Sequence, residues 1–246
     1  MNNFRFDTHM HLDLFNYREK VIEDIEKNKS YTIAVTNLPI LYEKYIKMYN
    51  DLKYIKFALG FHPELVYEYK DQLDIFFMNI NDSKYIGEIG LDYRGKDLKD
   101  REYQKYVFTK IIDKCNSLGG KVLTIHSRGA VNDVNRIIGK FNGSIIMHWF
   151  TGSEIELKKG VDNGYYFSVN EKMIKKKDLI AKIPINRILV ETDAPFLNGN
   201  RNIYSCSFIN KLIRELSNIY RVSEDIMNNQ LKNNFKNVLN VSLNNK

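Results

Sequence analysis

Cysteine and long apolar runs are scarce in this sequence of 246 residues. The two cysteines, Cys115 and Cys206, lie far apart and form no CxxC pair, so neither a disulfide framework nor a thiolate zinc site is indicated. No apolar run approaches the roughly 20 residues that cross a bilayer. The opening residues, MNNFRFDTHMHLD, lack the charged and apolar regions of a signal peptide. We therefore expect a cytoplasmic protein without a membrane partner.

The composition is that of a folded, basic protein. Hydrophobic residues make up 43% of the sequence and charged residues 27%, which allows a buried core and excludes a disordered chain. The formal charge of +7 favours polyanionic partners such as nucleic acid. High lysine usage weakens this argument, and we expect runs such as Lys175-Lys176-Lys177 on solvated helix faces.

Short β-like runs alternate with longer helical patterns along almost the whole chain, which is typical of βα units around a parallel sheet. Eight runs are predicted: Phe4 to Thr8, Thr32 to Thr36, Ile55 to Leu59, Tyr85 to Glu88, Val122 to His126, Ser144 to His148, Tyr165 to Val169 and Arg187 to Glu191. No repeat, linker or second domain interrupts the pattern, so residues 1–246 are expected to form a single domain. Eight such units in about 250 residues predict an α/β fold of the (β/α)8 TIM barrel type.

Two further helical stretches follow the last predicted strand, from Ser205 to Tyr220 and from Ser223 to Val238. The second begins with a serine suited to cap a helix, followed by Glu224 and Asp225. We expect both extra C-terminal helices to pack against the outer ring of the barrel.

Histidine is also rare, and the five histidines lie at or just after the ends of the predicted strands. His9 and His11 are two residues apart, so in an extended strand both rings face the same side. The active site of such a barrel lies at the carboxyl ends of its strands. Histidine with carboxylate suits zinc, manganese or iron. Strand-end residues therefore predict one metal centre built from His9, His11, Glu88, His126, His148 and Asp193.

Six motifs occur in order from Phe6 to about Phe196: DTHMHLD, GFHPE, GEIGLDYR, IHSRG, HWFTGS and ETDAPF. Through these motifs the chain resembles the TatD family of metal-dependent deoxyribonucleases, which belongs to the amidohydrolase-like barrels. Within that family, LTIHSRGA, MHWFTGS and the short length most resemble the QatD subgroup of the Qat antiphage system. The resemblance implies DNA as the substrate and other proteins of a defence complex as partners.

The resemblance also implies two divalent metal ions, of magnesium, manganese or zinc. One ion would be held by His9, His11, Glu88 and Asp193, and the other by Glu88, His126 and His148, with the Glu88 carboxylate as the bridge. Glu88 and Asp193 are the implied catalytic residues. Asp193 would either orient the attacking water and take its proton or act as a ligand alone.

Four polar residues are candidates for contact with the substrate: His62, Arg94, Arg128 and Arg201. A guanidinium group suits phosphate oxygens, but each arginine has the alternative of pairing with a nearby acid. His62 has the alternative of a structural hydrogen bond.

Four further residues near these motifs are interpreted as supports or competitors. Asp92 is expected to orient a ligand histidine, and Asp7 either does the same or bonds to backbone. Glu191 faces the same side as Asp193, two residues further along, and competes with it for the ligand role. Trp149 either stacks on a base or packs against a helix.

The leading functional prediction is a deoxyribonuclease that hydrolyses phosphodiester bonds as a 3'-5' exonuclease on single-stranded or frayed DNA. Two alternatives stay open at this point. One is an amidohydrolase-type amide or ester hydrolase, and the other is a nucleic-acid-binding or protein-binding subunit of a defence complex. The positive charge, together with Arg94 and Arg128, favours phosphate as the group that is attacked.

Overall fold

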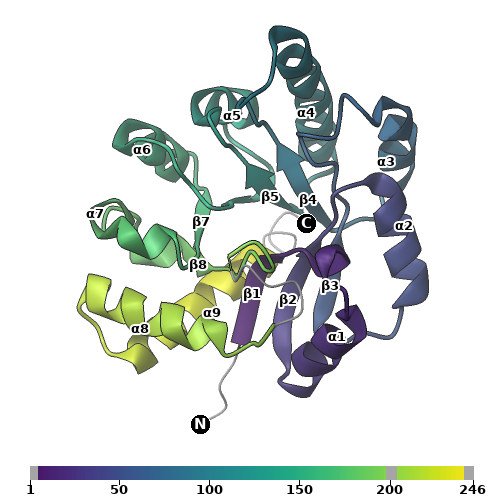
Figure 1. The fold of residues 1–246 in the computed structure, drawn as a ribbon. Coiled ribbons are helices and arrows are strands. Elements are labelled where there is room, and N and C mark those ends of the chain that lie inside the picture. The colour runs from purple at the N-terminus through teal and green to yellow at the C-terminus, as the bar shows by residue number, and fades with distance from the viewer. Residues whose placement is uncertain (1–4, 198–203, 241–246) are drawn as a thin grey trace.

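The computed structural model describes residues 5–197 and 204–240, and within them eight strands alternate with helices around a barrel (Figure 1). The strands are β1 (Arg5–Met10), β2 (Ser30–Val35), β3 (Ile55–Ala58), β4 (Tyr85–Gly90), β5 (Lys121–His126), β6 (Gly143–Met147), β7 (Tyr166–Val169) and β8 (Ile188–Val190). The helices are α1 (Arg18–Lys27), α2 (Pro39–Met48), α3 (Leu73–Asn79), α4 (Leu98–Leu118), α5 (Val131–Ile138), α6 (Glu154–Asp162), α7 (Lys177–Ile180), α8 (Phe208–Tyr220) and α9 (Glu224–Asn240).

All strand pairs are parallel, and the strands follow one another in chain order within two sheets, β1 to β3 and β4 to β8. A parallel bridge between Leu59 and Ile86 joins the two sheets on one side. On the other side the hydroxyl of Thr8 in β1 donates to the carbonyl of Val190 in β8 at 2.9 Å. These contacts close the ring, so the predicted (β/α)8 barrel is confirmed.

The strands end later than the sequence pattern predicts at two important places. β1 continues to Met10 and β4 continues to Gly90, so His9 and Glu88 lie inside strands. The reason is that backbone pairing carries on beyond the predicted ends, as in the pairing of Gly90 with His126. The predicted start of the first strand, Phe4, lies outside the described residues.

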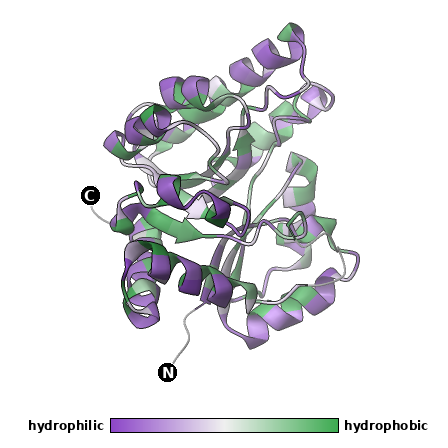
Figure 2. Ribbon diagram, turned by 60° about the vertical axis from the view of Figure 1, so that its left-hand side comes forward, coloured by the Kyte–Doolittle hydropathy of each residue, from purple (hydrophilic) through white to green (hydrophobic). Residues whose placement is uncertain are grey.

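The core lies between the strands and the surrounding helices. Strands covered on both sides read as continuous apolar runs, and nearly every residue of β5, β7 and β8 is buried. Figure 2 shows mostly hydrophobic strands enclosed by helices that mix hydrophobic and hydrophilic residues. Among the described residues, every helix is too short or too polar to span a bilayer.

The two C-terminal helices take different places. Helix α8 lies in the outer ring after β8, as expected, but α9 does not (Figure 1). In α9 the ring of Phe235 stacks on that of Phe6 near the start of β1, with centroids 5.3 Å apart. The carbonyl of Val238 accepts a hydrogen bond from Ser144 near the start of β6. Helix α9 therefore covers the amino-terminal opening of the barrel, while it also packs against α8 of the outer ring, as expected.

The position of α9 has a simple physical reason. Its apolar residues Met227, Leu231, Phe235 and Val238 form one helical stripe and are all buried. The ring of the barrel already holds eight helices, α1 to α8. The apolar amino-terminal end of the barrel is then the surface that remains for such a stripe. The sequence shows the stripe but not the surface that receives it. Ser223 caps this helix as predicted, because its hydroxyl accepts from the backbone N–H of Ile226 at 3.2 Å.

A buried lysine fixes the start of β5. The ammonium group of Lys121 donates to the carbonyls of Ile80, Asn81 and Ser83 at 2.8, 2.7 and 2.7 Å, and the residue is 7% exposed. These carbonyls lie between α3 and β4, so one side chain holds two barrel units together at the end opposite the histidines.

We expect Lys121→Met to lower the free energy of unfolding by about 3 kcal/mol, because three carbonyls lose a charged donor in a buried place. Urea unfolding followed by circular dichroism measures the change. Lys140→Met, at an exposed position, is the control and should leave the stability nearly unchanged. Equal stability of the two variants would contradict a structural role for Lys121.

Candidate metal centre

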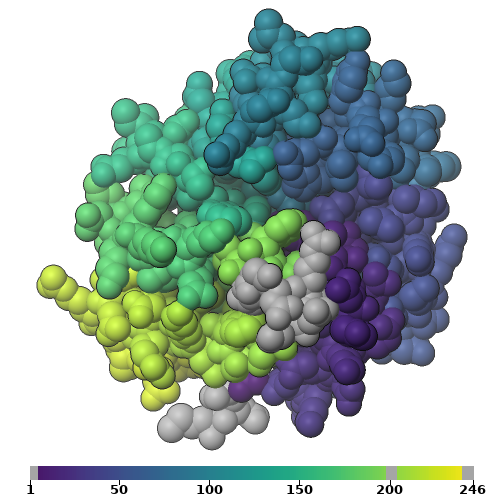
Figure 3. Space-filling view, in the orientation of Figure 1, coloured from purple at the N-terminus to yellow at the C-terminus, as the bar shows by residue number. Residues whose placement is uncertain are grey.

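Histidines and carboxylates from six βα units meet at the carboxyl end of the barrel. His9 lies in β1 and His11 just after it, Glu88 lies in β4, and His126 is the last residue of β5. His62 follows β3, His148 follows β6 and Asp193 follows β8. The segments after β1 and β8 lie side by side in the space-filling view, and the N–H of His11 donates to the carbonyl of Ala194 at 2.8 Å (Figure 3).

Glu88 lies at the middle of this cluster. Its Oε2 is 3.5 Å from Nε2 of His9, 3.2 Å from Nε2 of His11 and 3.6 Å from Nε2 of His62. Its Oε1 is 2.5 Å from Nδ1 of His126 and 3.8 Å from Nε2 of His148. One buried carboxylate thus faces five imidazoles, an arrangement that suits a bridging ligand.

The donor atoms fall into three overlapping groups, each with its members within 4.8 Å of one another. The groups are His9, His148 and Asp193; His9, His11 and Glu88; and His62, Glu88 and His126. This division differs from the one that the family resemblance implies. The ring of His148 stacks on that of His9 with centroids 3.6 Å apart, and His62 joins Glu88 and His126 in its place.

Asp193 provides a test of whether these residues fit a cation. Its Oδ1 is buried without a hydrogen-bond partner among the described residues, although it lies 3.7 Å from Nε2 of His11 and 3.9 Å from Nε2 of His9. A buried acceptor that receives no donor costs free energy, and a divalent cation between carboxylate and imidazoles removes that cost. The residue also has a φ of 48°, a left-handed conformation that a non-glycine residue adopts only under local constraint. The residues present therefore fit a divalent metal.

Three side chains hold the histidine rings from behind. Oδ2 of Asp92 lies 2.7 Å from Nε2 of His126, and Oε1 of Glu191 lies 2.9 Å from Nδ1 of His148. The hydroxyl of Thr124 lies 2.7 Å from Nδ1 of His9. Such partners fix the orientation of a ligand ring.

These contacts settle several roles that the sequence left open. Asp92 orients His126 as expected. Glu191 points to the far nitrogen of His148 and to Ser168 and Asn170, so it positions a histidine instead of competing with Asp193. Thr124 was missed, and its only signal is that it faces inward with His126, two residues later in β5.

Asp7 supports the loop after β8. It accepts hydrogen bonds from the backbone N–H of Thr192 at 2.9 Å and from the Thr192 hydroxyl at 2.5 Å. It also accepts from the backbone N–H of His9 at 3.2 Å. Burial raises the pKa of Asp7 to about 7, against the lowering effect of these hydrogen bonds. Asp7 therefore bonds mainly to Thr192 and to backbone, the second of its two expected roles.

The histidines of the cluster differ widely in their pKa values. Burial lowers the pKa of His9 to about 4 and that of His62 to about 3. Burial also acts to lower the pKa of His126 and His148, but neighbouring carboxylates outweigh it and raise these values to about 9 and about 10. Burial opposes the charge on Glu88, yet His62 and His126 hold its pKa well below the usual value.

The residues expected to contact the substrate differ in whether their side chains already have partners in the protein. The side chain of Arg128 donates to Asp92 at 2.7 Å and to Glu64 at 2.9 Å, which is the acid pairing left open above. Arg94 is exposed, and only its backbone N–H has a described bond, to Asp92 at 3.0 Å. His62 accepts from the backbone N–H of Glu64 at 3.3 Å. Arg201 lies outside the described residues.

Trp149 follows His148 and is partly buried against the core. The ammonium group of Lys172 lies 5.1 Å from the centroid of its ring. The backbone N–H of Trp149 donates to Glu191 at 3.2 Å. These contacts favour packing over base stacking for this ring.

Comparison with known proteins agrees with the site. The family described as TatD related DNase matches residues 6–240, and the chain belongs to this family. It is 31% identical over 218 residues to "Uncharacterized metal-dependent hydrolase YabD" of Bacillus subtilis, covering 80% of this chain and 84% of that protein. It is 27% identical over 222 residues to human "Deoxyribonuclease TATDN3", covering 80% of each. The chain is thus a metal-dependent hydrolase of the TatD family.

Two solved structures share the fold. The TatD homolog YJJV from Escherichia coli superposes with a TM-score of 0.84 at 22% sequence identity, covering 98% of this chain and 99% of that one. A TatD family hydrolase from Entamoeba histolytica superposes with a TM-score of 0.79 at 21% identity, covering 97% and 98%. Both comparisons support the barrel assignment.

We expect manganese binding to release at least two protons per protein at pH 7, because imidazoles must lose their protons to bind a metal and His126 and His148 hold theirs up to pKa values of about 9 and about 10. Burial raises the pKa of Asp193 to about 7, so this ligand adds to the release. The apparent affinity should therefore rise with pH from 6 towards 9. Calorimetric titrations in buffers of different ionisation enthalpy measure the released protons.

Asp92→Asn should release fewer protons than the native chain, because it removes one carboxylate that raises the pKa of His126. Asp162→Asn, at the end of α6 and exposed through most of its side chain, is the control. A proton release that Asp92→Asn leaves unchanged would show that the charge of Asp92 does not set the protonation of His126.

Proposed function

We propose that this protein is a divalent-metal-dependent deoxyribonuclease that hydrolyses phosphodiester bonds. The observation that carries the proposal is the cluster itself: the buried carboxylate of Glu88 faces five imidazoles beside an unpartnered oxygen of Asp193. The name of the human relative, a deoxyribonuclease, supports DNA as the substrate.

We infer two metal sites that share Glu88. His9, His11 and Asp193 would hold one ion with it, and His126 would hold the other together with His148 or His62, both of which reach Glu88. Magnesium, manganese and zinc are the candidate ions. When bound, the pair would polarise the phosphodiester and lower the pKa of a water molecule, so that hydroxide would form at neutral pH.

The protein's own groups supply the remaining chemistry. Asp193 Oδ1 receives no hydrogen bond from the described residues, so it is free to orient the attacking water or to accept its proton. Asp92, Glu191 and Thr124 keep the rings of His126, His148 and His9 in place without reorganisation during the reaction.

Two arginines would guide the phosphate backbone. Arg94 is exposed beside Asp92 and free to reach a phosphate oxygen, whereas Arg128 would have to share its guanidinium with Asp92 and Glu64. His62 would serve the second metal site or contact the scissile phosphate. Arg201, which lies outside the described residues, is a further candidate from the sequence.

The proposed substrate is a single strand or a frayed end, cleaved in the 3'-5' direction. A site at the mouth of a barrel receives the end of one strand more readily than an intact duplex. Membership of the QatD subgroup, a role in antiphage defence with other proteins of a defence complex, and a cytoplasmic location remain predictions from the sequence. The motifs LTIHSRGA and MHWFTGS support the first of these.

We expect Glu88→Ala and His126→Ala each to lower metal-dependent release of nucleotides by at least about 100-fold, since each removes a ligand and unbalances the buried charges. End-labelled single-stranded and double-stranded DNA with magnesium or manganese serve as substrates, and amide and lactone reporters test the amidohydrolase alternative. Glu88→Gln, which keeps the size and shape of the side chain but removes its charge, is a further site variant. Glu154→Ala on the surface is the control. Retained cleavage in both site variants would defeat the proposal.

We expect Arg94→Ala to raise the KM for DNA about fivefold without changing metal affinity, because its side chain contacts no described residue of the cluster. Arg128→Ala should also weaken manganese binding about tenfold, because Asp92 loses a donor and orients His126 less firmly. Steady-state kinetics and manganese titrations separate the two effects, with Lys158→Ala as the surface control. Identical behaviour of the two arginine variants would contradict the distinction.

A further inference from the structure

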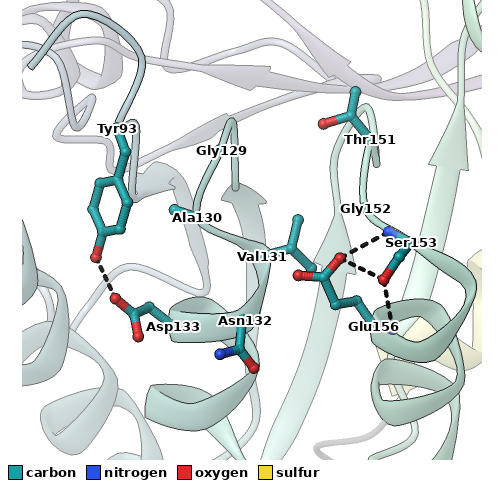
Figure 4. A pocket seen from close by; sticks show the side chains of 10 residues that line it. All are labelled: Tyr93, Gly129, Ala130, Val131, Asn132, Asp133, Thr151, Gly152, Ser153 and Glu156. Atoms are coloured by element: carbon teal, nitrogen blue, oxygen red, sulfur yellow. Dashed lines mark hydrogen bonds between the residues drawn. The ribbon is translucent and has the colours of Figure 1, made fainter.

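A second cavity opens on the same face of the barrel as the candidate metal centre. Its volume is about 420 Å³, within the range of small-ligand clefts (Figure 4). Tyr93 from the loop after β4 lines it, together with residues 129–133, which lead into the first turn of α5, and residues 151–153 before α6. Glu156 of α6 completes the lining. None of these residues belongs to the metal centre.

The cavity adjoins that centre along three strands. Tyr93 directly follows Asp92, residue 129 comes three residues after His126, and Thr151 comes three residues after His148. Three residues of chain span at most about 10 Å. The cavity therefore lies next to the candidate metal centre on the side of β4, β5 and β6, and Arg128 stands in the loop between them.

One wall of the cavity is a fixed aromatic ring. The hydroxyl of Tyr93 donates to Oδ2 of Asp133 at 2.7 Å, and the guanidinium of Arg101 lies 5.3 Å from the ring centroid. The ammonium group of Lys105 also lies 5.6 Å from the centroid, and together these contacts hold the ring in one orientation. Figure 4 shows the ring standing at one side of the cavity with its hydroxyl towards Asp133.

The opposite wall is the backbone at Gly152, where a side chain would be directed into neighbouring atoms of the protein. A Cβ at Gly152 would lie 2.6 Å from Cζ of Phe150 and 3.0 Å from Oε2 of Glu156. No side chain fits at this position, and Gly129 likewise brings no side chain to the lining. We call the cavity between Tyr93 and the backbone at Gly152 the slot, and Ala130 and Val131 line it between these two sides.

The slot offers carboxylate acceptors beside the amide of Asn132 and the hydroxyl groups of Thr151 and Ser153. Oε2 of Glu156 accepts from the backbone N–H and the hydroxyl of Ser153 at 2.7 and 2.8 Å, whereas Oε1 has no hydrogen bond within the described part of the chain (Figure 4). Asp133 already accepts from Tyr93 and from Arg136. The oxygen of Glu156 without a described hydrogen bond suits an N–H donor on a neutral ring.

We propose that the slot between Tyr93, Gly152 and Glu156 binds a nucleobase that carries an exocyclic amino group, belonging to a nucleotide that adjoins the cleaved phosphodiester. The inference rests on the proposed deoxyribonuclease function and adds a base preference to it. Tyr93 stacks on the base, and Glu156 accepts from its amino group. The strand is thereby anchored next to the metal centre, and cytosine and adenine are held more tightly than thymine.

The substrate side of the test uses single-stranded oligonucleotides that differ at one nucleotide beside the cleaved bond, on either flank. Cytosine, adenine, thymine and an abasic sugar are compared at that position. Loss of base stacking should raise the KM at least fivefold for the abasic substrate at one flank. Thymine should fall between cytosine and the abasic sugar. An equal KM for all four substrates at both flanks would overturn the proposal.

The protein side of the test blocks or empties the slot. Thr151→Trp fills the cavity from its exposed edge, and Tyr93→Leu removes the ring; in both, the gap between cytosine and abasic substrates should collapse to within twofold. Glu156→Gln should remove the preference for cytosine over thymine while keeping an acceptor for Ser153. Ile155→Trp is the matched control on the same helix, 82% exposed and outside the slot, and should keep the native preference.

A reporter without planar groups, an oligonucleotide built of abasic sugars throughout, separates this inference from the function on which it rests. It carries no nucleobase, so its cleavage by Thr151→Trp and Tyr93→Leu should match that by the native chain. If the native protein cleaves DNA with a base preference and these variants keep that preference, the inference about the slot is overturned and the proposed function is not. A native protein that cleaves neither DNA nor the reporter would overturn the proposed function and the slot together.

Discussion

The buried charge of Glu88 is the constraint on which the rest of the site depends. A carboxylate taken out of water must be compensated, and here the compensation comes from imidazoles on four other strands and loops. The same need places Asp92 behind His126 and Glu191 behind His148, since each of these two rings faces Glu88 with one nitrogen and a second acid with the other. Charge balance thus extends outward from one side chain to a second layer of acids.

The barrel allows this concentration of charge because its two ends have separate tasks. At the amino end, Lys121 and the apolar stripe of α9 fix the strands and close the opening. At the carboxyl end, loops are free to carry histidines, acids and the Tyr93 slot. Stability and chemistry are therefore kept apart in space, as in other barrels of this architecture.

The sequence predicts the barrel and most of the cluster for identifiable reasons. Alternating periodicities predict the strands, and the two-residue spacing of His9 and His11 is enough to place both rings on one side of an extended strand. The pairing of Asp92 with His126 also follows from their neighbouring strand ends. All these features depend on local pattern or on the general rule for strand ends.

Other features depend on distances between segments that no local pattern encodes. The stacking of His148 on His9, the place of His62 beside Glu88, and the support of His9 by Thr124 all need the closed ring. The position of α9 under the barrel is of the same kind. The Tyr93 slot is formed by loops that follow three strands, and in the sequence its glycines look like ordinary turn residues.

One oxygen atom connects the surface of this protein to its centre. Oδ2 of Asp92 accepts both from Arg128, whose side chain is 43% exposed, and from Nε2 of His126. The guanidinium of Arg128 and the imidazole of His126 thus share one acceptor, so the position of an arginine side chain at the rim bears on the orientation of a ring that faces Glu88.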